Sequence, residues 1–140
     1  MIKIECFQNI TDTHEYLKLI GVEKFFFDAT AKLTNGQHKQ QAQVLTYIRN
    51  SSPCSIFVLY TLSKEIGLWV KPDLRNRYLG THMMKFSLVN KKLIIGRYPI
   101  YARTNICSTS SGTAMRKILE RSKFQKISTG TYLDLWKFYQ

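Results

Sequence analysis

Two arginines and a glycine stand close together in the middle of the chain, directly before a segment with helical spacing. Arg75 and Arg77 carry forked N–H donors that match phosphate oxygens, and Gly80 follows where the helix is expected to begin. The first backbone N–H groups of a helix have no partner within it, and the helix dipole adds partial positive charge there. The sequence therefore predicts a site for a phosphate-bearing ligand in this loop.

A hairpin and a helix must position the loop. Residues 55–62 are nearly continuously apolar and predict a central strand, which a short turn joins to a second strand over Glu65–Val70. A turn containing Pro72 then leads into the basic loop, and the helix after the loop ends before Lys91. An ordinary strand–helix unit with a basic turn would show the same local pattern.

The spacing of these residues resembles the central motif of the GNAT N-acetyltransferase superfamily. In that family a strand ending in Val is followed by Pro, then by Arg/Gln-x-x-Gly-x-Gly/Ala and a helix. Val70, Pro72, Arg75 and Gly80 match this pattern, and Tyr78 stands where the first Gly is usual. That Gly normally lets the backbone approach a phosphate without a side chain in the way.

The resemblance implies acetyl-CoA as the cofactor, bound by two neighbouring segments. The backbone at the end of the strand would pair with the pantetheine arm, and the loop with the first helical turn would hold the pyrophosphate. The residues assigned in this way are Leu68, Trp69, Val70, Arg75, Asn76, Arg77, Tyr78, Leu79, Gly80 and Thr81.

A second resemblance lies near the C-terminus. The segment from Ala114 to Phe124 is similar to the family's Asn-x-x-Ala-x-x-x-Leu-Tyr-Glu-Lys-x-Gly-Phe segment, in the right order and at the right distance from the central motif. It departs at Gly112, Leu119 and Lys123, where Asn, Tyr and Gly are usual. In many members that Tyr is the general acid that protonates the departing thiolate, which Leu119 cannot do.

The implied reaction is acyl transfer from acetyl-CoA to an amine within a ternary complex, which depends mostly on positioning. Glu65 is the carboxylate nearest the reacting groups and is the candidate base, although a surface carboxylate paired with Lys64 or Lys71 would have the same sequence. The candidates to replace the missing acid are Tyr101, Ser108 and Ser111.

Composition indicates one folded domain spanning residues 1–140. The chain is 44% hydrophobic, has no apolar run long enough to cross a membrane, and begins without a recognisable secretory leader. Three widely spaced cysteines and three scattered histidines predict neither a disulfide framework nor a metal site. We expect a cytoplasmic protein.

The charge is strongly basic and unevenly distributed. The formal net charge is +12, and residues 64–103 contain nine basic and two acidic residues. Such a field attracts acetyl-CoA and also larger anionic partners, such as tRNA, DNA or acidic protein surfaces. Lysines that only keep the surface soluble are the simpler explanation.

The predicted fold class is α/β (α+β), with a GNAT-like mixed sheet of about six strands, flanked by about four helices. Its central parallel strands, 65–70 and 98–104, would splay apart to admit the acetyl-pantetheine arm. The other predicted strands cover residues 1–7, 125–127 and 132–138, and the other predicted helices cover 14–20, 37–50 and 113–122. With a helix at 37–50 the first half would lack one strand of the family fold, and the C-terminal strand is the candidate edge for a homodimer.

These sequence features are compatible with three alternative functions. The first is an acetyl-CoA-dependent N-acyltransferase that acts on an amine of a protein, a peptide, a small molecule or an RNA-linked substrate. The second is a catalytically divergent GNAT-like domain that binds nucleic acid or protein through its basic face. The third is a GNAT-fold transferase that uses a different donor, for example to modify nucleic acid.

Overall fold

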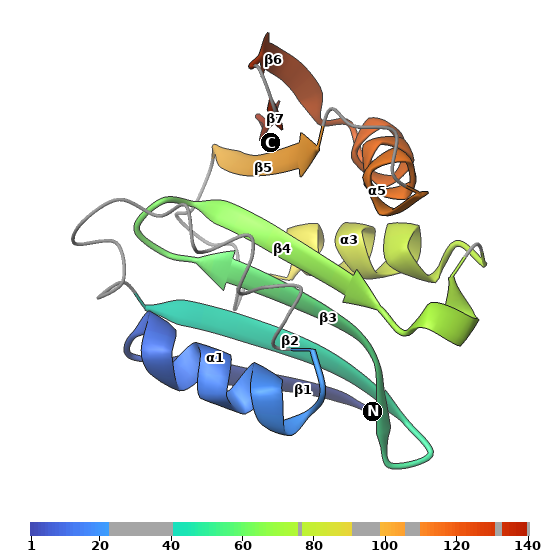
Figure 1. Cartoon of the computed structure of the whole chain (residues 1–140). Helices are drawn as coiled ribbons and strands as arrows, with labels where there is room; N and C mark the ends of the chain where they lie inside the picture. Colours follow the sequence, from blue (N-terminus) through green and yellow to red (C-terminus); the bar gives the residue numbers. More distant parts are fainter. Residues whose placement is uncertain (23–40, 76, 91–98, 106–109, 131–132, 140) are drawn as a thin grey trace.

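A seven-stranded mixed sheet forms the centre of the molecule in the computed structural model, which describes residues 1–22, 41–75, 77–90, 99–105, 110–130 and 133–139 (Figure 1). The strand order is β1-β2-β3-β4-β5-β7-β6. The strands are β1 (Ile2–Phe7), β2 (Ala42–Arg49), β3 (Ser52–Tyr60), β4 (Glu65–Val70), β5 (Ile100–Asn105), β6 (Gln125–Thr129) and β7 (Leu133–Phe138). The helices of the described residues are α1 (Ile10–Leu19), α3 (Leu79–Val89), α5 (Ser110–Arg121) and the short 3-10 helix η2 (Pro72–Leu74).

Strands β4 and β5 are parallel and separate almost at once. Their register contains one pair, Glu65 opposite Tyr101, and the Tyr101 N–H donates to the Lys64 carbonyl at 2.9 Å. Beyond this pair the two arrows diverge, so that the space between the strands widens along their direction (Figure 1). All the other neighbouring strands in the described sheet are antiparallel. The predicted splay is therefore confirmed.

The prediction of a helix over residues 37–50 is wrong where the structure describes the segment. Residues 42–49 form β2, which pairs with β1 on one side and with β3 on the other. The helical spacing of Ala42, Leu45 and Ile48 arose by chance in a strand that has buried residues on both of its faces. The first half of the fold consequently does not lack the expected strand, because β2 supplies it.

Helix α1 begins earlier than predicted. The predicted helix covered residues 14–20, whereas the N-cap is Asn9, whose backbone is extended and whose side-chain oxygen accepts from the Asp12 N–H at 2.8 Å. This bond satisfies one of the free donors of the first turn. The apolar side chains of α1 then pack on one face of β2 and β3, with Leu17 fully buried.

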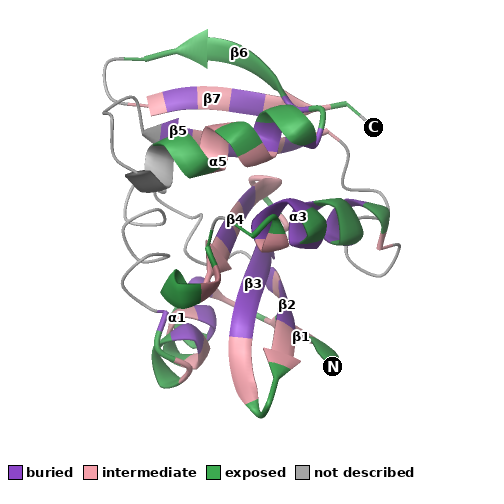
Figure 2. Ribbon diagram, turned by 90° about the vertical axis from the view of Figure 1, so that its right-hand side faces the viewer, coloured by how far each residue is buried: buried purple, intermediate pink, exposed green. Residues whose placement is uncertain are grey.

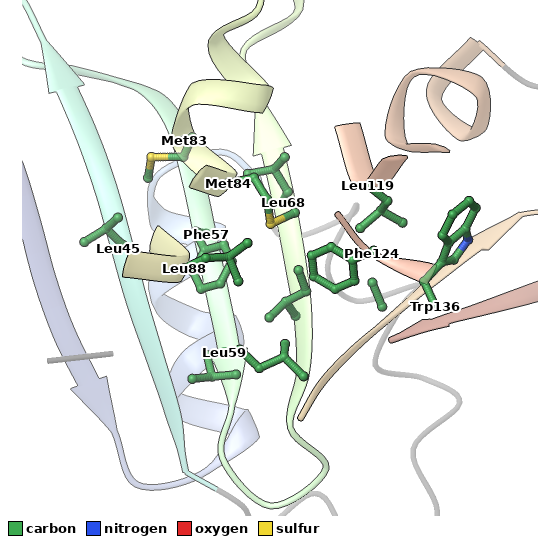
Figure 3. Packing of buried hydrophobic residues seen from close by; sticks show 13 residues of the cluster. Leu45, Phe57, Leu59, Leu68, Met83, Met84, Leu88, Leu119, Phe124 and Trp136 are labelled. Carbon is green, nitrogen blue, oxygen red and sulfur yellow. The ribbon is translucent and has the colours of Figure 1, made fainter. Parts of the chain in front are cut away.

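Two apolar clusters lie on opposite faces of the sheet. The smaller cluster lies under α1, and the larger, here called the central cluster, lies under α3 and α5. Figure 3 shows that the central cluster continues across β4, with Met84 of α3 on one side and Leu119 and Phe124 on the other. Side-chain packing therefore joins the two halves of the sheet where the backbone pairing is interrupted.

The C-terminal elements correct two further predictions. Helix α5 begins at Ser110, three residues before the predicted start at residue 113, and Ala114 is exposed. The C-terminal strand is β7, which lies between β5 and β6 and has no free edge. At this end of the sheet the edge strand is β6, which is exposed along its whole length (Figure 2). The prediction that the C-terminal strand offers a free edge to a homodimer is therefore wrong, and the formation of a dimer stays a prediction.

In the described part of the chain, no helix combines the length and the apolar character that crossing a bilayer requires.

One buried hydrogen bond fixes β5 against β7. The Trp136 indole N–H donates to the Thr104 hydroxyl at 2.9 Å, and both side chains are buried. Thr104→Val should lower the free energy of unfolding by about 1–3 kcal/mol, because the indole N–H is left without a partner. Urea denaturation measures this loss. The same substitution in a Trp136→Phe background should have a much smaller effect, and an equal loss in both backgrounds would contradict this role for the hydrogen bond.

Candidate functional site

The basic loop is anchored to the end of β4. Helix η2 begins with Pro72 in its first turn, and the Arg75 side chain folds back so that its Nε donates to the Val70 carbonyl at 2.8 Å. Arg77 is exposed, and Asn76 lies outside the described residues. Arg75 therefore shapes the loop with one of its donors, while Arg77 presents its guanidinium to solvent.

Tyr78 has the backbone conformation for which a glycine is suited. It is the N-cap of α3 with φ 61° and ψ 6°, in the left-handed region. Its ring turns toward α5, where the Arg121 guanidinium lies 4.9 Å from the ring centroid. The cation–π contact offsets part of the backbone strain at this position. Figure 1 shows the start of α3 on the same side of the sheet as α5.

Gly80 has a different role, which is close packing. A Cβ atom at this position would lie 2.7 Å from Ile118 Cδ1 of α5 and 3.3 Å from Val70 Cγ2 of β4. Both distances are shorter than ordinary contact, so the absence of a side chain lets α3 approach β4 and α5. The chain keeps glycine at the position that needs space and has tyrosine at the position that needs a positive φ.

The first turn of α3 carries polar groups without partners. The Thr81 side chain is buried, and its hydroxyl makes no hydrogen bond in the structure. Tyr78 provides no side-chain cap, so the backbone N–H groups of the first turn are also left to a ligand or to solvent. Leu79 is partly buried in the same turn. This turn can donate several hydrogen bonds to one anion.

The edge of β4 that faces β5 is available beyond Glu65. Because the Lys64 carbonyl points toward β5, the backbone groups of Leu68 and Val70 point the same way and those of Trp69 point toward β3. Strand β5 offers them no pairing, and the Val70 carbonyl already accepts from Arg75. Among the three residues predicted to contact pantetheine, the Leu68 backbone groups and the Val70 N–H face the gap, and the Trp69 backbone groups face β3.

Glu65 forms an ion pair that the sequence analysis did not predict. Both of its carboxylate oxygens accept from Arg103 of β5, from Nε at 2.5 Å and from Nη2 at 2.8 Å. Both side chains are partly buried. The expected surface pairing with Lys64 or Lys71 is absent from the ion pairs of the described residues. The bidentate pair lies beside the single β4–β5 backbone pair and closes that end of the gap.

Tyr60 was also not identified from the sequence as a residue next to the candidate site. It lies opposite Glu65 in the β3–β4 register, is almost fully buried, and its hydroxyl has no hydrogen-bond partner. Burial raises the pKa of this hydroxyl, and the Glu65 carboxylate raises it further. Tyr60 is consequently a neutral phenol at physiological pH.

One sequence feature could have pointed to Arg103 as a residue of the site. It lies two residues after Tyr101 on the same strand, which puts both side chains on the same face of the sheet.

The structure separates the predicted acid candidates. Tyr101 is partly buried next to the β4–β5 pair, whereas Ser108 lies outside the described residues, as does the side chain of Ser111. Leu119 is fully buried in the central cluster. A hydroxyl at position 119 would point into this apolar packing. The site therefore contains a phosphate-type loop, a free strand edge and a closed end made by Glu65 and Arg103.

The same architecture occurs in solved acetyltransferase structures. The chain aligns along 98% of its length with 99% of an acyl-CoA N-acyltransferase from Pseudomonas aeruginosa, at a TM-score of 0.62 and 14% identity. The chain of 140 residues therefore has the GNAT fold. The N-acetyltransferase PseH of Campylobacter jejuni, in complex with acetyl coenzyme A, aligns over 100% of this chain and 99% of its own at 13% identity, with a TM-score of 0.55.

A third solved acetyltransferase structure is similar to the chain along its whole length. The PaiA N-acetyltransferase of Thermoplasma acidophilum, in complex with coenzyme A, covers 99% of each chain at 12% identity, with a TM-score of 0.59. No family model matches the sequence, and no curated protein matches it. At these identities the similarity shows the GNAT fold alone.

The strain at Tyr78 can be measured with a matched pair of variants. Tyr78→Ala and Tyr78→Gly both remove the ring that contacts Arg121, but only glycine also relieves the left-handed conformation. We expect Tyr78→Gly to be more stable than Tyr78→Ala by about 1 kcal/mol in urea denaturation. Equal stability of the two variants would show that the backbone at residue 78 is not strained.

Proposed function

We propose that this protein is an acetyl-CoA-dependent N-acyltransferase that acetylates an amine. The observation that carries the proposal is that a free strand edge and a helix N-terminus follow each other directly along the chain from β4. The edge of the strand is free beside β5, and the strand then leads through η2 into a helix N-terminus with unpartnered donors. One extended ligand with an amide-containing arm and a phosphate end fits both features. The CoA complexes of PseH and PaiA support the same ligand for this fold.

The residues present fit the cofactor. The buried Thr81 hydroxyl without a partner and the first N–H groups of α3 provide donors for a pyrophosphate, and Arg77 adds an exposed cation beside them. Leu68 would hold the pantetheine arm through its backbone, as an added strand partner does. Bound acetyl-CoA would supply an acyl group activated as a thioester, whose C–S bond breaks as the amine forms the C–N bond and the thiolate takes up the proton that the amine loses.

The chain contributes mainly by orientation. The Leu68 N–H is the donor nearest to a carbonyl placed in the gap, and it would polarise that carbonyl without any movement of the strand. Glu65 remains the candidate base for the amine proton, although its two oxygens already accept from Arg103. A carboxylate held in this way can equally act as a positioning residue that keeps β4 and β5 together. Tyr101 and Ser108 remain the proposed acids.

Cofactor binding tests the proposal directly. Arg77→Ala should weaken acetyl-CoA binding about tenfold in calorimetric titration, because one charge-assisted contact to phosphate is lost. Arg75→Ala should weaken it at least as much, since the loop also loses its anchor to Val70. Lys85→Ala, an exposed position on α3, is the matched control and should leave the affinity unchanged. Wild-type protein that gives no heat and no thermal shift with millimolar acetyl-CoA would refute the cofactor assignment.

The role of Glu65 can be separated from that of a structural carboxylate. The test is a double-mutant cycle of Glu65→Gln, Arg103→Gln and the double variant, in which the free energy of unfolding and the enzymatic activity of each protein are measured. A catalytic base predicts that only Glu65→Gln removes the acidic limb of the pH profile of kcat/KM. A positioning pair predicts that both single variants lose similar stability, about 1–3 kcal/mol, with the double variant losing little more. A fully additive cycle would contradict the positioning role.

A second function is favoured by the helix α5. Leu119 offers no proton donor. Lys117 and Arg121, one turn apart on this helix, and Lys123 just after it are exposed and make this part of the surface basic. A divergent GNAT-fold domain that binds tRNA or DNA through this surface would show affinity that falls steeply with salt concentration. Nucleic-acid binding without acetyl-CoA binding would favour this function over the transferase.

A further inference from the structure

A group of basic and aromatic side chains lies beside the closed end of the β4–β5 gap. Along β5, Ile100 and Ala102 belong to the central cluster, so the alternate residues Tyr101 and Arg103 have side chains on the opposite face of the sheet. Lys137 lies opposite Tyr101 in the β5–β7 register. These residues, together with Tyr139, are here called the apex group. All four keep some exposure to solvent.

The Lys137 ammonium is held without being neutralised. Its Nζ lies 5.6 Å from the centre of the Tyr101 ring and 4.5 Å from the centre of the Tyr139 ring, so it makes a cation–π contact with each. Among the ion pairs of the described residues, none involves Lys137. The rings fix the position of the cation and leave its charge for another partner.

Arg103 also has unused donors. Its Nε and one N–H of Nη2 are directed to Glu65, and the other guanidinium N–H groups are free of that pair. Residues in the diagonal relation of Arg103 and Lys137 on paired strands have Cβ atoms about 7–8 Å apart or closer, within reach of two long side chains. One anionic group can therefore contact both cations.

The balance of charge in the apex group favours an anion. Arg103 and Lys137 contribute two positive charges, and Glu65, the one carboxylate that pairs with either of them among the ion pairs of the described residues, is already bound to Arg103. This surplus lies on the face of the sheet that α3 and α5 do not cover, next to the start of the gap in which the thioester would lie. An acceptor amine that approaches from this face meets the surplus charge.

We propose that the acceptor amine carries an anionic group, a carboxylate or a phosphate, that binds between Lys137 and Arg103. The inference rests on the proposed acetyltransferase function and specifies its substrate class. The aromatic rings of Tyr101 and Tyr139 keep Lys137 in place for this contact. Arg103 joins the anion subsite to Glu65 at the end of the β4–β5 gap.

The test uses four tripeptide amides of the same length, with free N-termini: Ala-Asp-Ala, Ala-phosphoserine-Ala, Ala-Asn-Ala and Ala-Lys-Ala. Acetyl transfer gives kcat/KM for each, and calorimetric titration of the CoA-bound protein gives their affinities without turnover. We expect the wild type to prefer Ala-Asp-Ala or Ala-phosphoserine-Ala over Ala-Asn-Ala about fivefold, mainly through KM, and the preference to shrink with added salt. The two acidic peptides distinguish a carboxylate from a phosphate.

Two variants connect the preference to the apex group. Lys137→Gln should reduce the acidic-to-neutral ratio to near one, and Lys137→Glu should reverse it in favour of Ala-Lys-Ala. Lys126→Gln, an exposed lysine of β6 opposite Trp136 and therefore on the other face, should leave the ratio as in the wild type.

The outcomes separate this inference from the proposed function. Acetyl-CoA binding with equal affinity for acidic and neutral peptides would overturn the inference and leave the transferase proposal standing. A preference that survives in Lys137→Gln would overturn it as well. A Lys137-dependent preference for acidic peptides in a protein that fails to bind CoA, measured on the free protein, would support the anion subsite and refute the transferase.

Discussion

Strands β4 and β5 are held to each other by one backbone pair and one ion pair, and the site depends on that sparse connection. The pair of Glu65 with Tyr101 and the contact of Glu65 with Arg103 close one end of the gap. Further pairing would cover the Leu68 backbone, and no pairing would leave β5 without a fixed register to β4. The central cluster supplies the cohesion that the backbone lacks, because its side chains come from both halves of the sheet (Figure 3).

The loop after β4 shows how one motif combines two independent requirements. A left-handed residue is needed where α3 begins, and a residue without a side chain is needed two positions later, where α3 approaches Ile118 and Val70. Tyr78 meets the first requirement with strain that its contact with Arg121 partly offsets, and Gly80 meets the second. A tyrosine at the first position is thus compatible with the fold. Its ring lies toward α5, so the backbone of the first turn of α3 stays open to a ligand.

The sequence predicted the second half of the fold better than the first, for physical reasons. Glu65–Val70 and the loop after it carry position-specific signals, namely a proline, paired arginines and a glycine that packing requires. Strand β2 carries only an apolar run, whose buried residues on both faces imitate helical spacing. Its β-branched residues Val44, Thr46 and Ile48 were the signal that favoured a strand.

The site residues divide in the same way. Backbone contributions from Leu68 and the first turn of α3 followed from the motif, because strand and helix geometry place them. The partner of Glu65 did not follow, since Arg103 lies 38 residues further along the chain and meets Glu65 only through the parallel pairing. Lys137 and Tyr139 come from β7, whose position beside β5 depends on a strand order that the sequence left open. Local sequence patterns cannot predict contacts between strands that are distant in the sequence.

The single β4–β5 pair also leaves the angle between the two halves of the sheet without a strand ladder to fix it. Rotation about residues 65 and 101 would change the width of the gap without breaking another backbone hydrogen bond between the two strands. Resistance to that rotation comes from side chains that pack across β4, such as Phe124 and Leu119. The width of the gap is therefore set by the volumes of buried side chains, while the Glu65–Arg103 end keeps the register of the two strands.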